Sequence, residues 1–499
     1  MTEILVIGAG PAGLAAASAA RRRGANVTLL DSADQLGGQF WRHLPDSRPA
    51  AREGVLHHGW HRFAALRDAL VADAGCRIIR GAQVWAIEPA ATEPSATEPS
   101  ATEPSTTDAA TVHVVVGPSD GADRENLTFT PDTIVLATGA HDRTLPFPGW
   151  DLPGVFTGGA AQALAKGERV AVGQRVVVAG AGPFLLPVAA SLAGVGATVL
   201  GVFEANRPST LLRGWLPKPW QLIPAASKGL ELAGYAAGQL RHRIPYRPGS
   251  AVIAAHGTDR VESVTVAALT ADWSPIPGTE RTIAADAVCV SHGFTPRLEL
   301  AIAAGCDLTA GRFVRVDDSQ LTSTPGVYAA GEITGIGGVD LALAEGQLAG
   351  HTAAGGRVSD ASVRRAVRRR DVFRGFAARI EAAHAIRSGW RDWLTEDTVV
   401  CRCEEVRYGR LCHSAAGTGA QSLRTLKLAT RAGLGICQGR ICGRSVEELL
   451  AASAPHGVLT DGTISDRRPI AAPLRLGELA RLAQATDHSG STHERTIHD

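Results

Sequence analysis

The chain has 499 residues, enough for about three domains, and its 45% apolar content excludes a wholly disordered protein. Fifty basic residues stand against 49 acidic ones, so the formal net charge is +1 and no global field would hold nucleic acid or an anionic membrane. We therefore expect small molecules or other proteins as partners, and no nucleic acid. The 56 glycines indicate many positions where the backbone approaches something closely.

The N-terminal segment alternates between strand, glycine turn, helix and strand. Glu3–Ile7 is an apolar run typical of a buried strand, Leu14–Arg23 an alanine-rich helix, and Val27–Leu30 a second strand. Between the first strand and the helix lies GxGxxG, which permits a tight turn and close approach to a pyrophosphate at the helix N-terminus. An acid after the second strand would accept hydrogen bonds from a ribose. The predicted dinucleotide site comprises Gly8, Gly10, Pro11, Ala12, Gly13 and Asp31. The alternative is a glycine turn that serves packing alone.

Three successive copies of the pentapeptide ATEPS occupy residues 91–105. This polar, proline-punctuated tract buries too little apolar area to order itself. We expect it to form a lengthened surface loop between two strands.

The pattern of strand, glycine turn, helix and strand returns in the middle of the chain. The strand at 176–179 leads to Gly180 and Gly182, and the strand at 198–203 ends at Glu204, which is placed to accept a ribose hydroxyl. Leu185 takes the place of the third glycine, which relaxes the packing of the helix on the strand. Two interpretations stay open for this domain: a working NAD(P) site, or a retained fold that holds no nucleotide.

No segment predicts a membrane span or a secretory signal. The longest uncharged run, Val176–Phe203, is interrupted by Pro183 and Pro187, which mark turns. The apolar N-terminus has Glu3 as its only early charge and runs into arginines at its far end, the reverse of the polarity of a signal peptide. We therefore expect a cytoplasmic protein without a transmembrane segment.

Further glycine-rich segments bear on which dinucleotide the first site takes. GGQ follows the second strand, VLATG covers Val135–Gly139, and GVYAAGE and TGIGG lie between Gly326 and Gly338. This set resembles the two-dinucleotide-binding-domain flavoproteins, and the resemblance implies FAD at the first site. That family usually has aspartate where this chain has Glu332, so the contact to the ribityl chain would have one methylene more; an ordinary acid at a helix start is the alternative. The resemblance adds these candidate residues: Gly37, Gly38, Gln39, Val84, Ala137, Thr138, Gly139, Gly331, Glu332, Gly337 and Gly338.

Five of the eight cysteines cluster near the C-terminus, which favours metal ligation over disulfides in a reducing compartment. Cys401 and Cys403 form CxC, and Cys437 and Cys442 form CxxxxC, which gives four thiolates for a [2Fe-2S] cluster or a structural zinc. Zinc ribbons generally use two CxxC knuckles, so this spacing disfavours zinc. The segments CRCEEV and TRAGLGICQGRICG closely resemble the bacterioferritin-associated-ferredoxin-like (BFD-like) [2Fe-2S] domain. Cys412 lies outside the paired spacing and is expected to be a small buried apolar residue.

Together these segments predict an α/β fold with two Rossmann-like domains followed by a small BFD-like [2Fe-2S] domain. The arginine-rich stretches 363–370 and 374–386 are expected to form helices that join the two parts. The expected boundaries are 1–155 with 310–356 for the FAD domain, 156–309 for the NAD(P)-like domain, 357–397 for the helical linker, 398–450 for the [2Fe-2S] domain, and 451–499 for an extension with a disordered end.

The order of these motifs, with LATGAHDRTLPFPGW between the two nucleotide motifs, resembles the alpha subunits of bacterial heteromeric amino-acid dehydrogenases and opine oxidases. These include D-hydroxyproline and L-proline dehydrogenases, octopine and nopaline oxidases, and hydrogen cyanide synthase. In such complexes a beta subunit similar to D-amino-acid oxidase removes the hydride and the alpha subunit relays electrons. The resemblance therefore implies a hetero-oligomer with that partner, and in some members an FMN held between the subunits.

The residues themselves agree with a relay role, because we find no convincing acid–base constellation. His57, His58 and His61 share one arginine-bearing stretch, for which a solvated helix face is expected rather than catalysis. Two alternatives remain: a self-sufficient NAD(P)H-dependent reductase, and a non-enzymatic iron or redox sensor. The absence of CxxC in the sequence removes the dithiol route of thioredoxin-reductase-type enzymes.

Overall fold

The computed structural model describes residues 1–50, 53–89, 110–121, 123–217, 219–454, 457–461, 464–468 and 470–481. The ATEPS tract and the predicted disordered end lie outside these residues. The strands that flank the tract, β4 (Ala82–Glu88) and β5 (Thr111–Val116), pair with each other in antiparallel register.

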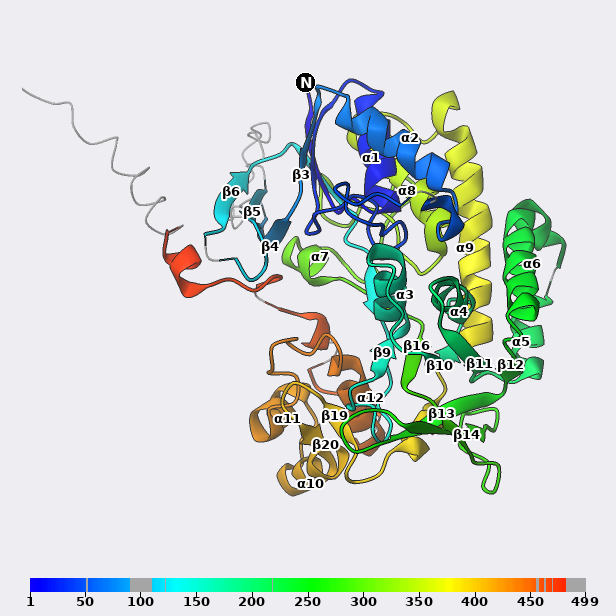
Figure 1. Cartoon of the computed structure of the whole chain (residues 1–499). Coiled ribbons are helices and arrows are strands. Elements are labelled where there is room, and N and C mark those ends of the chain that lie inside the picture. The colour runs from blue at the N-terminus through cyan, green and yellow to red at the C-terminus, as the bar shows by residue number, and fades with distance from the viewer. Residues whose placement is uncertain are drawn as a thin grey trace, which may run out of the picture.

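The first nucleotide motif opens a five-stranded parallel sheet (Figure 1). Its strands, in spatial order, are β18 (Val327–Ala329), β7 (Thr133–Leu136), β1 (Glu3–Ile7), β2 (Asn26–Leu30) and β3 (Cys76–Ile79). Helix α1 (Pro11–Arg21) packs closely on α8 (Gly338–Ala353), because Gly346 and Gly350 would each place a Cβ within 2.1 Å of an α1 carbonyl oxygen. The first predicted strand is confirmed, and the predicted helix begins three residues earlier than expected, at Pro11.

The second motif opens a similar sheet in the middle of the molecule. Its strands, in spatial order, are β12 (Tyr246–Pro248), β11 (Thr198–Glu204), β10 (Arg175–Ala181), β16 (Ala287–His292) and β9 (Val155–Thr157), with helices α3 (Gly158–Gly167) and α4 (Leu185–Gly194). A two-stranded link, β8 (Ala140–Asp142) with β17 (Phe294–Pro296), connects the two nucleotide-binding units. Residues at this link therefore lie near both motifs.

The two arginine-rich stretches form one continuous helix, α9 (Arg364–His384), instead of two. It packs along α8 and α5 (Pro208–Trp215), and Arg374 forms a 3.1 Å ion pair with the buried Glu345 of α8. Helix α9 thus runs from the first nucleotide-binding unit to the second (Figure 1), where the side chain of its last residue, His384, is 9% exposed.

The C-terminal cysteines lie in a small unit below β9 in Figure 1. It comprises β19 (Val399–Cys401), β20 (Val406–Arg407), α10 (Tyr408–Thr418), α11 (Leu423–Thr430) and α12 (Gly443–Ser453). Its core is continuous with that of the second nucleotide-binding unit through tryptophans: the Trp393 indole donates to the Trp273 carbonyl (2.9 Å), and the Trp150 indole donates to the Val399 carbonyl. The shared apolar core and these hydrogen bonds fix the cysteine unit against the second nucleotide-binding unit.

Candidate functional site

A cavity of about 2120 Å³ reaches from the first nucleotide motif to the loop of the second and on to the cysteine unit. Gly13, Gly37, Gly180 and Glu204 are not among its lining residues. The residues predicted for the two nucleotide sites that do line it are Gly8, Gly10, Pro11, Ala12, Asp31, Gly38, Gln39, Val84, Ala137, Thr138, Gly139, Gly182, Gly331, Glu332, Gly337 and Gly338. The structure therefore gathers most of the predicted FAD residues around one space, although their roles as FAD contacts stay predictions.

The glycines of the first motif divide into structural and cavity-facing positions. Gly8 has a φ of +107°, and a Cβ there would lie 2.3 Å from the Ala137 carbonyl oxygen. A Cβ at Gly13 would lie 1.7 Å from the Gly8 carbonyl oxygen, so only glycine lets the helix approach the strand. The nearest atom to a Cβ at Gly10 is the Cα of Gly38, 3.9 Å away. No protein atom therefore crowds the backbone at Gly10, as expected where a pyrophosphate approaches the backbone.

Asp31 presents a partly satisfied carboxylate to this cavity. Its Oδ2 accepts a hydrogen bond from the Ala9 N–H (2.5 Å) and its Oδ1 accepts one from the Ala33 N–H (2.8 Å). A carboxylate has about four acceptor positions, so about two remain for ribose hydroxyls. Burial raises the pKa of Asp31 above its usual range, against the effect of the two N–H donors. The residues at the first motif thus fit a bound dinucleotide.

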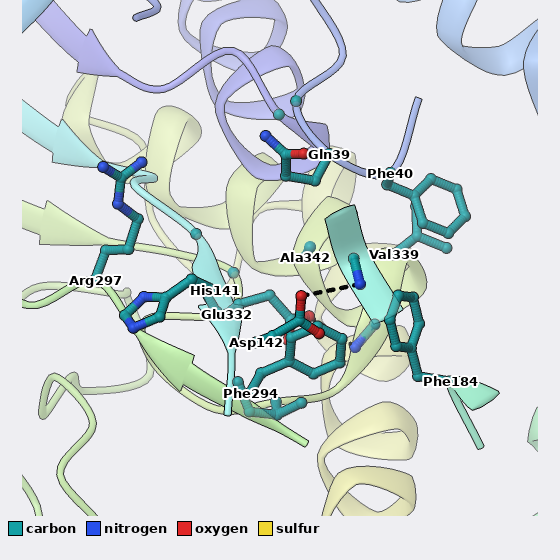
Figure 2. Close-up of a pocket in the computed structure, with 18 of the residues that line it drawn as sticks. Gln39, Phe40, His141, Asp142, Phe184, Phe294, Arg297, Glu332, Val339 and Ala342 are labelled. Atoms are coloured by element: carbon teal, nitrogen blue, oxygen red, sulfur yellow. Dashed lines mark hydrogen bonds between the residues drawn. The ribbon is translucent and has the colours of Figure 1, made fainter. Parts of the chain in front are cut away.

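Glu332 lies on the cavity wall, and its side chain reaches the start of α8. Its Oε1 accepts a hydrogen bond from the Gly338 N–H (2.9 Å), so the role of a helix-start acid is observed. Burial, aided by the nearby Glu345 carboxylate, raises the pKa of Glu332 to about 7. Figure 2 shows Gln39 at one end of this part of the cavity, Phe184 and Phe294 at the other, and Glu332 between them. The ribityl contact remains a prediction.

The second motif has a different helix start. Helix α1 begins directly after Gly10, but α4 begins only at Leu185, after a turn in which the Leu185 N–H bonds to the Gly182 carbonyl. Phe184, which precedes this helix, meets Phe294 edge to face with their ring centroids 4.9 Å apart. The N-terminus of α4 is therefore displaced from the glycine that would approach a pyrophosphate.

Glu204, the acid of the second motif, is fully buried and already partnered. Its Oε2 accepts from the Gly182 N–H (2.9 Å), and its Oε1 accepts from the Asn206 N–H (3.0 Å) and the Asn206 side-chain amide (2.9 Å). Nδ1 of His384, the last residue of α9, lies 3.3 Å from the same Oε2, and the Trp215 indole N–H donates to the other ring nitrogen. The end of helix α9 thus contacts the Glu204 carboxylate, which does not line the cavity.

Four cysteines line a second, smaller cavity of about 210 Å³, as the CxC and CxxxxC spacing predicted. They form two pairs. Cys442 hydrogen-bonds Cys401, which lowers the pKa of Cys401 to about 6, and Cys403 contacts Cys437. In the described part of the chain no three His, Cys, Asp or Glu side chains form a group that would hold one metal ion. Two pairs of thiols suit the two irons of a [2Fe-2S] cluster better than the single four-ligand shell of zinc.

The two cavities share a wall formed by Cys437 and Ile441. On the side of the larger cavity, His141 of β8 donates from Nε2 to the Arg440 carbonyl (3.1 Å), and burial lowers the pKa of its ring. The Arg440 guanidinium is held by Glu299 at 2.8 Å. The loop that carries Cys437 and Arg440 is therefore fixed against strand β8.

Two sequence expectations are wrong. Cys412 is exposed rather than buried, because its position on α10 faces solvent. His57 is buried and its pKa is lowered to about 3, mainly by burial, while His58 and His61 are exposed as expected. The His57 ring stacks on Trp60 with the centroids 5.1 Å apart. Since His57 precedes α2 (Trp60–Val71), the helix-face pattern did not apply to it.

Sequence reasoning missed three residues that the structure brings to the site: His141, Ile441 and His384. His141 and His384 act through contacts with residues far away in the chain, and Ile441 lines both cavities. His141 and Ile441 lie inside the segments that carry the resemblance, but nothing in those segments singles them out. A histidine that ends a long arginine-rich helix has no sequence signal for contact with Glu204.

Comparison with known proteins bears on the fold and on the cofactors. Residues 2–349 match the sequence profile described as pyridine nucleotide-disulphide oxidoreductase, and residues 399–452 match the BFD-like [2Fe-2S] binding domain. An opine oxidase subunit of Rhizobium meliloti is 31% identical over 495 residues, covering 96% of this chain and 87% of the relative. Hydrogen cyanide synthase subunit HcnB of Pseudomonas aeruginosa is 30% identical over 484 residues, covering 93% of this chain and 96% of the relative.

Among solved structures, L-proline dehydrogenase from P. horikoshii has a TM-score of 0.62 at 19% identity, covering 96% of this chain and 79% of that chain. This likeness shows the fold alone. The two profile matches confirm the expected fold class and the expected cofactors, FAD and a [2Fe-2S] cluster. Among the described helices, none has the length and apolar character needed to cross a bilayer.

Proposed function

Since the chain belongs to the pyridine nucleotide-disulphide oxidoreductase family and carries a BFD-like [2Fe-2S] domain, we propose that it is the electron-transfer subunit of a heteromeric dehydrogenase or oxidase acting on an amino acid, an amine or an opine. When bound, FAD takes up an electron pair and the cluster passes single electrons. The first motif would hold the FAD, and Cys401, Cys403, Cys437 and Cys442 would hold the cluster.

The observation that carries this proposal is the wall that the two cavities share. Cys437, a predicted cluster ligand, and Ile441 face both the cavity of the first motif and the cavity of the four cysteines. His141 and the ion pair between Arg440 and Glu299 hold this wall in place. Only side chains, with no intervening domain, therefore separate the predicted flavin cavity from the predicted cluster, as a relay requires.

The role within a complex rests on relatives and on the cavity. The relatives in opine oxidase and hydrogen cyanide synthase are themselves subunits by name. In the larger cavity the Asp142 carboxylate is engaged by the chain, since it accepts hydrogen bonds from the Gly159 N–H (2.9 Å) and the Ser291 hydroxyl (3.1 Å). We infer that a partner similar to D-amino-acid oxidase oxidises the substrate, and that this chain takes up the electrons.

Expression of the chain alone, and together with its substrate-oxidising partner, tests this proposal. The complex should oxidise its amino acid or opine with an artificial electron acceptor, and the isolated chain should not, although it contains both cofactors. If the isolated chain oxidises the substrate at the rate of the complex, the assignment as an electron-transfer subunit is wrong.

A second candidate is a self-sufficient NAD(P)H-dependent reductase, because Gly182 of the second motif lines the same cavity as the first motif. The burial of Glu204 and its contact with His384 count against it, since a nicotinamide dinucleotide would need that carboxylate for its ribose. We therefore favour the electron-transfer subunit.

A further inference from the structure

Helix α6 (Ala226–Arg241) stands at the edge of the molecule, beside α5 (Figure 1). It has 16 residues, and none of its described side chains is buried. A Cβ built at Gly229, Gly234 or Gly238 would meet no atom within 4 Å. An amphipathic helix of a globular protein normally buries one face. Helix α6 contacts α4 and the 3-10 helix η2 (Pro219–Ala225) but buries none of its described side chains against them.

Polar contacts also anchor this helix. Lys228 lies 2.7 Å from Glu231 and 3.1 Å from Asp340 at the start of α8. Tyr235 hydrogen-bonds Glu231 (3.3 Å), and its ring centroid lies 5.7 Å from that of His58. These contacts fix the position of α6 while leaving its leucines free.

The exposed leucines belong to a segment rich in exposed apolar side chains, which comprises α5, η2 and α6. We call this the α5–α6 surface. Its large exposed apolar side chains include Leu216, Trp220, Ile223, Leu230, Leu232 and Leu240. Single exposed apolar residues are normal on a protein surface, whereas large exposed apolar patches mark interaction sites.

The same stretch carries unpaired positive charge. Five exposed arginines on or next to these elements make no ion pair among the described residues: Arg207, Arg213, Arg241, Arg243 and Arg247. The one carboxylate of α6, Glu231, is already paired with Lys228. The fitting partner therefore has an apolar centre and an acidic rim, since an interface commonly combines aromatic and apolar anchors with complementary charges at its edge.

The α5–α6 surface also borders the large cavity. Lys228, Glu231, Leu232 and Tyr235 of α6 line the cavity that reaches the first nucleotide motif. Leu232 is at the same time 54% exposed, so the cavity and the outer surface meet at this residue. A protein bound here would close the cavity and face the predicted flavin. A bilayer would cover the apolar residues but would supply no electrons to that cavity.

We propose that the α5–α6 surface docks the substrate-oxidising flavoprotein subunit, through an apolar patch ringed by acidic residues on that partner. This proposal rests on the proposed function and adds the place and the chemistry of the subunit contact. The partner's electrons would enter through the cavity at Leu232 and leave through the wall at Cys437 and Ile441.

The test compares two leucines of matched exposure. Leu230 on α6 is 77% exposed, and Leu428 on α11 is 75% exposed, so neither Leu230→Lys nor Leu428→Lys disturbs a core. The substrate-oxidising subunit, separated from the complex isolated from native cells, is titrated onto each full-length variant loaded with both cofactors. We expect Leu230→Lys to weaken binding at least about tenfold and Leu428→Lys to leave it unchanged. Arg241→Glu should also weaken binding and reduce its salt dependence.

The outcomes separate the two proposals. If both leucine variants bind the partner as the unchanged chain does, the docking surface is wrong while the proposed function stands. If the unchanged chain binds no such subunit, the proposed function fails and the docking surface fails with it. If Leu230→Lys instead abolishes self-association in ultracentrifugation, or binding to phosphatidylglycerol vesicles, with partner binding intact, the surface serves a second copy or a membrane and the proposal is overturned.

Discussion

The two nucleotide motifs share the order of strand, glycine turn, helix and strand, but they differ in what covers the acid at the end of the second strand. Asp31 is 9% exposed, lines the cavity and accepts hydrogen bonds from two backbone N–H groups. Glu204 is 0% exposed, accepts three hydrogen bonds and lies 3.3 Å from the imidazole of His384. An acidic residue at the same place in the fold thus lines the cavity in one unit and is enclosed by the chain in the other.

This difference shows that a retained fingerprint does not by itself give a retained site. The glycines of the second motif still serve the backbone: a Cβ at Gly180 would lie 1.8 Å from the Ser291 carbonyl oxygen, much as Gly8 requires at the first motif. A strand-to-helix turn needs such glycines whether or not a nucleotide binds. The state of the acidic residue distinguishes the two units, and that state depends on a helix from elsewhere in the chain.

The largest effect is expected where the cavity of the first motif meets the cysteines. Cys437→Ser should abolish the cluster signal in electron paramagnetic resonance and lower electron transfer from flavin to acceptor by about 100-fold or more, because a ligand is lost. Cys412→Ser is the matched control, since Cys412 is exposed and lies outside the cluster cavity. Full cluster content in Cys437→Ser would contradict the ligand assignment.

The next largest effect tests the open first motif. Gly10→Ala adds a methyl group that meets no protein atom closer than 3.9 Å, so the free energy of unfolding of the flavin-free chain should fall by only about 1 kcal/mol, the loss of a glycine helix cap. The methyl group would occupy the approach of the pyrophosphate, so the flavin content should fall about tenfold or more. The measurements are thermal unfolding and flavin absorbance per protein. Unchanged flavin content would mean that FAD does not lie against Gly10.

A paired substitution compares the two acids directly. Asp31→Asn should weaken FAD binding by about 10- to 100-fold, because hydrogen bonds to a charged group contribute about 1.5–3 kcal/mol. Glu204→Gln should leave FAD binding unchanged and instead lower the free energy of unfolding by about 1–3 kcal/mol, because an amide N–H₂ then faces N–H donors. Flavin titration and denaturant unfolding measure the two effects. Equal loss of flavin in both variants would contradict the claim that Asp31, and not Glu204, contacts the FAD.

The smallest effect concerns pH. The pKa of Glu332 is raised from its usual 4.5 to about 7, so the folded flavin-free chain holds a proton there that the unfolded chain releases. The associated stability is present below pH 4.5 and is lost as pH rises to about 7. Relative to Glu332→Gln, the unchanged chain should lose on the order of 2 kcal/mol of unfolding free energy across this range and nothing further above it. A pH-independent difference would show that Glu332 is not protonated in the folded chain.

Local patterns were sufficient to predict what depends on local sequence. The strand Glu3–Ile7, the glycine turn, the helix and Asp31 follow from periodicity and turn chemistry, and the cysteine spacing placed four thiols around one cavity. The closure of Glu204 did not follow, because His384 comes from a distant helix. The burial of His57 against Trp60 and the exposure of Cys412 likewise depend on packing that no short window contains.

The contrast between the open and the closed motif makes one claim most directly testable: the flavin receives electrons from a partner protein and not from a nicotinamide. The purified chain, loaded with FAD and its cluster, is mixed anaerobically with excess NADH or NADPH, and the flavin absorbance is followed from milliseconds to minutes. We expect no bleaching with either nicotinamide, and bleaching when the reduced substrate-oxidising subunit is added. Rapid reduction of the flavin by NADH or NADPH would contradict the account.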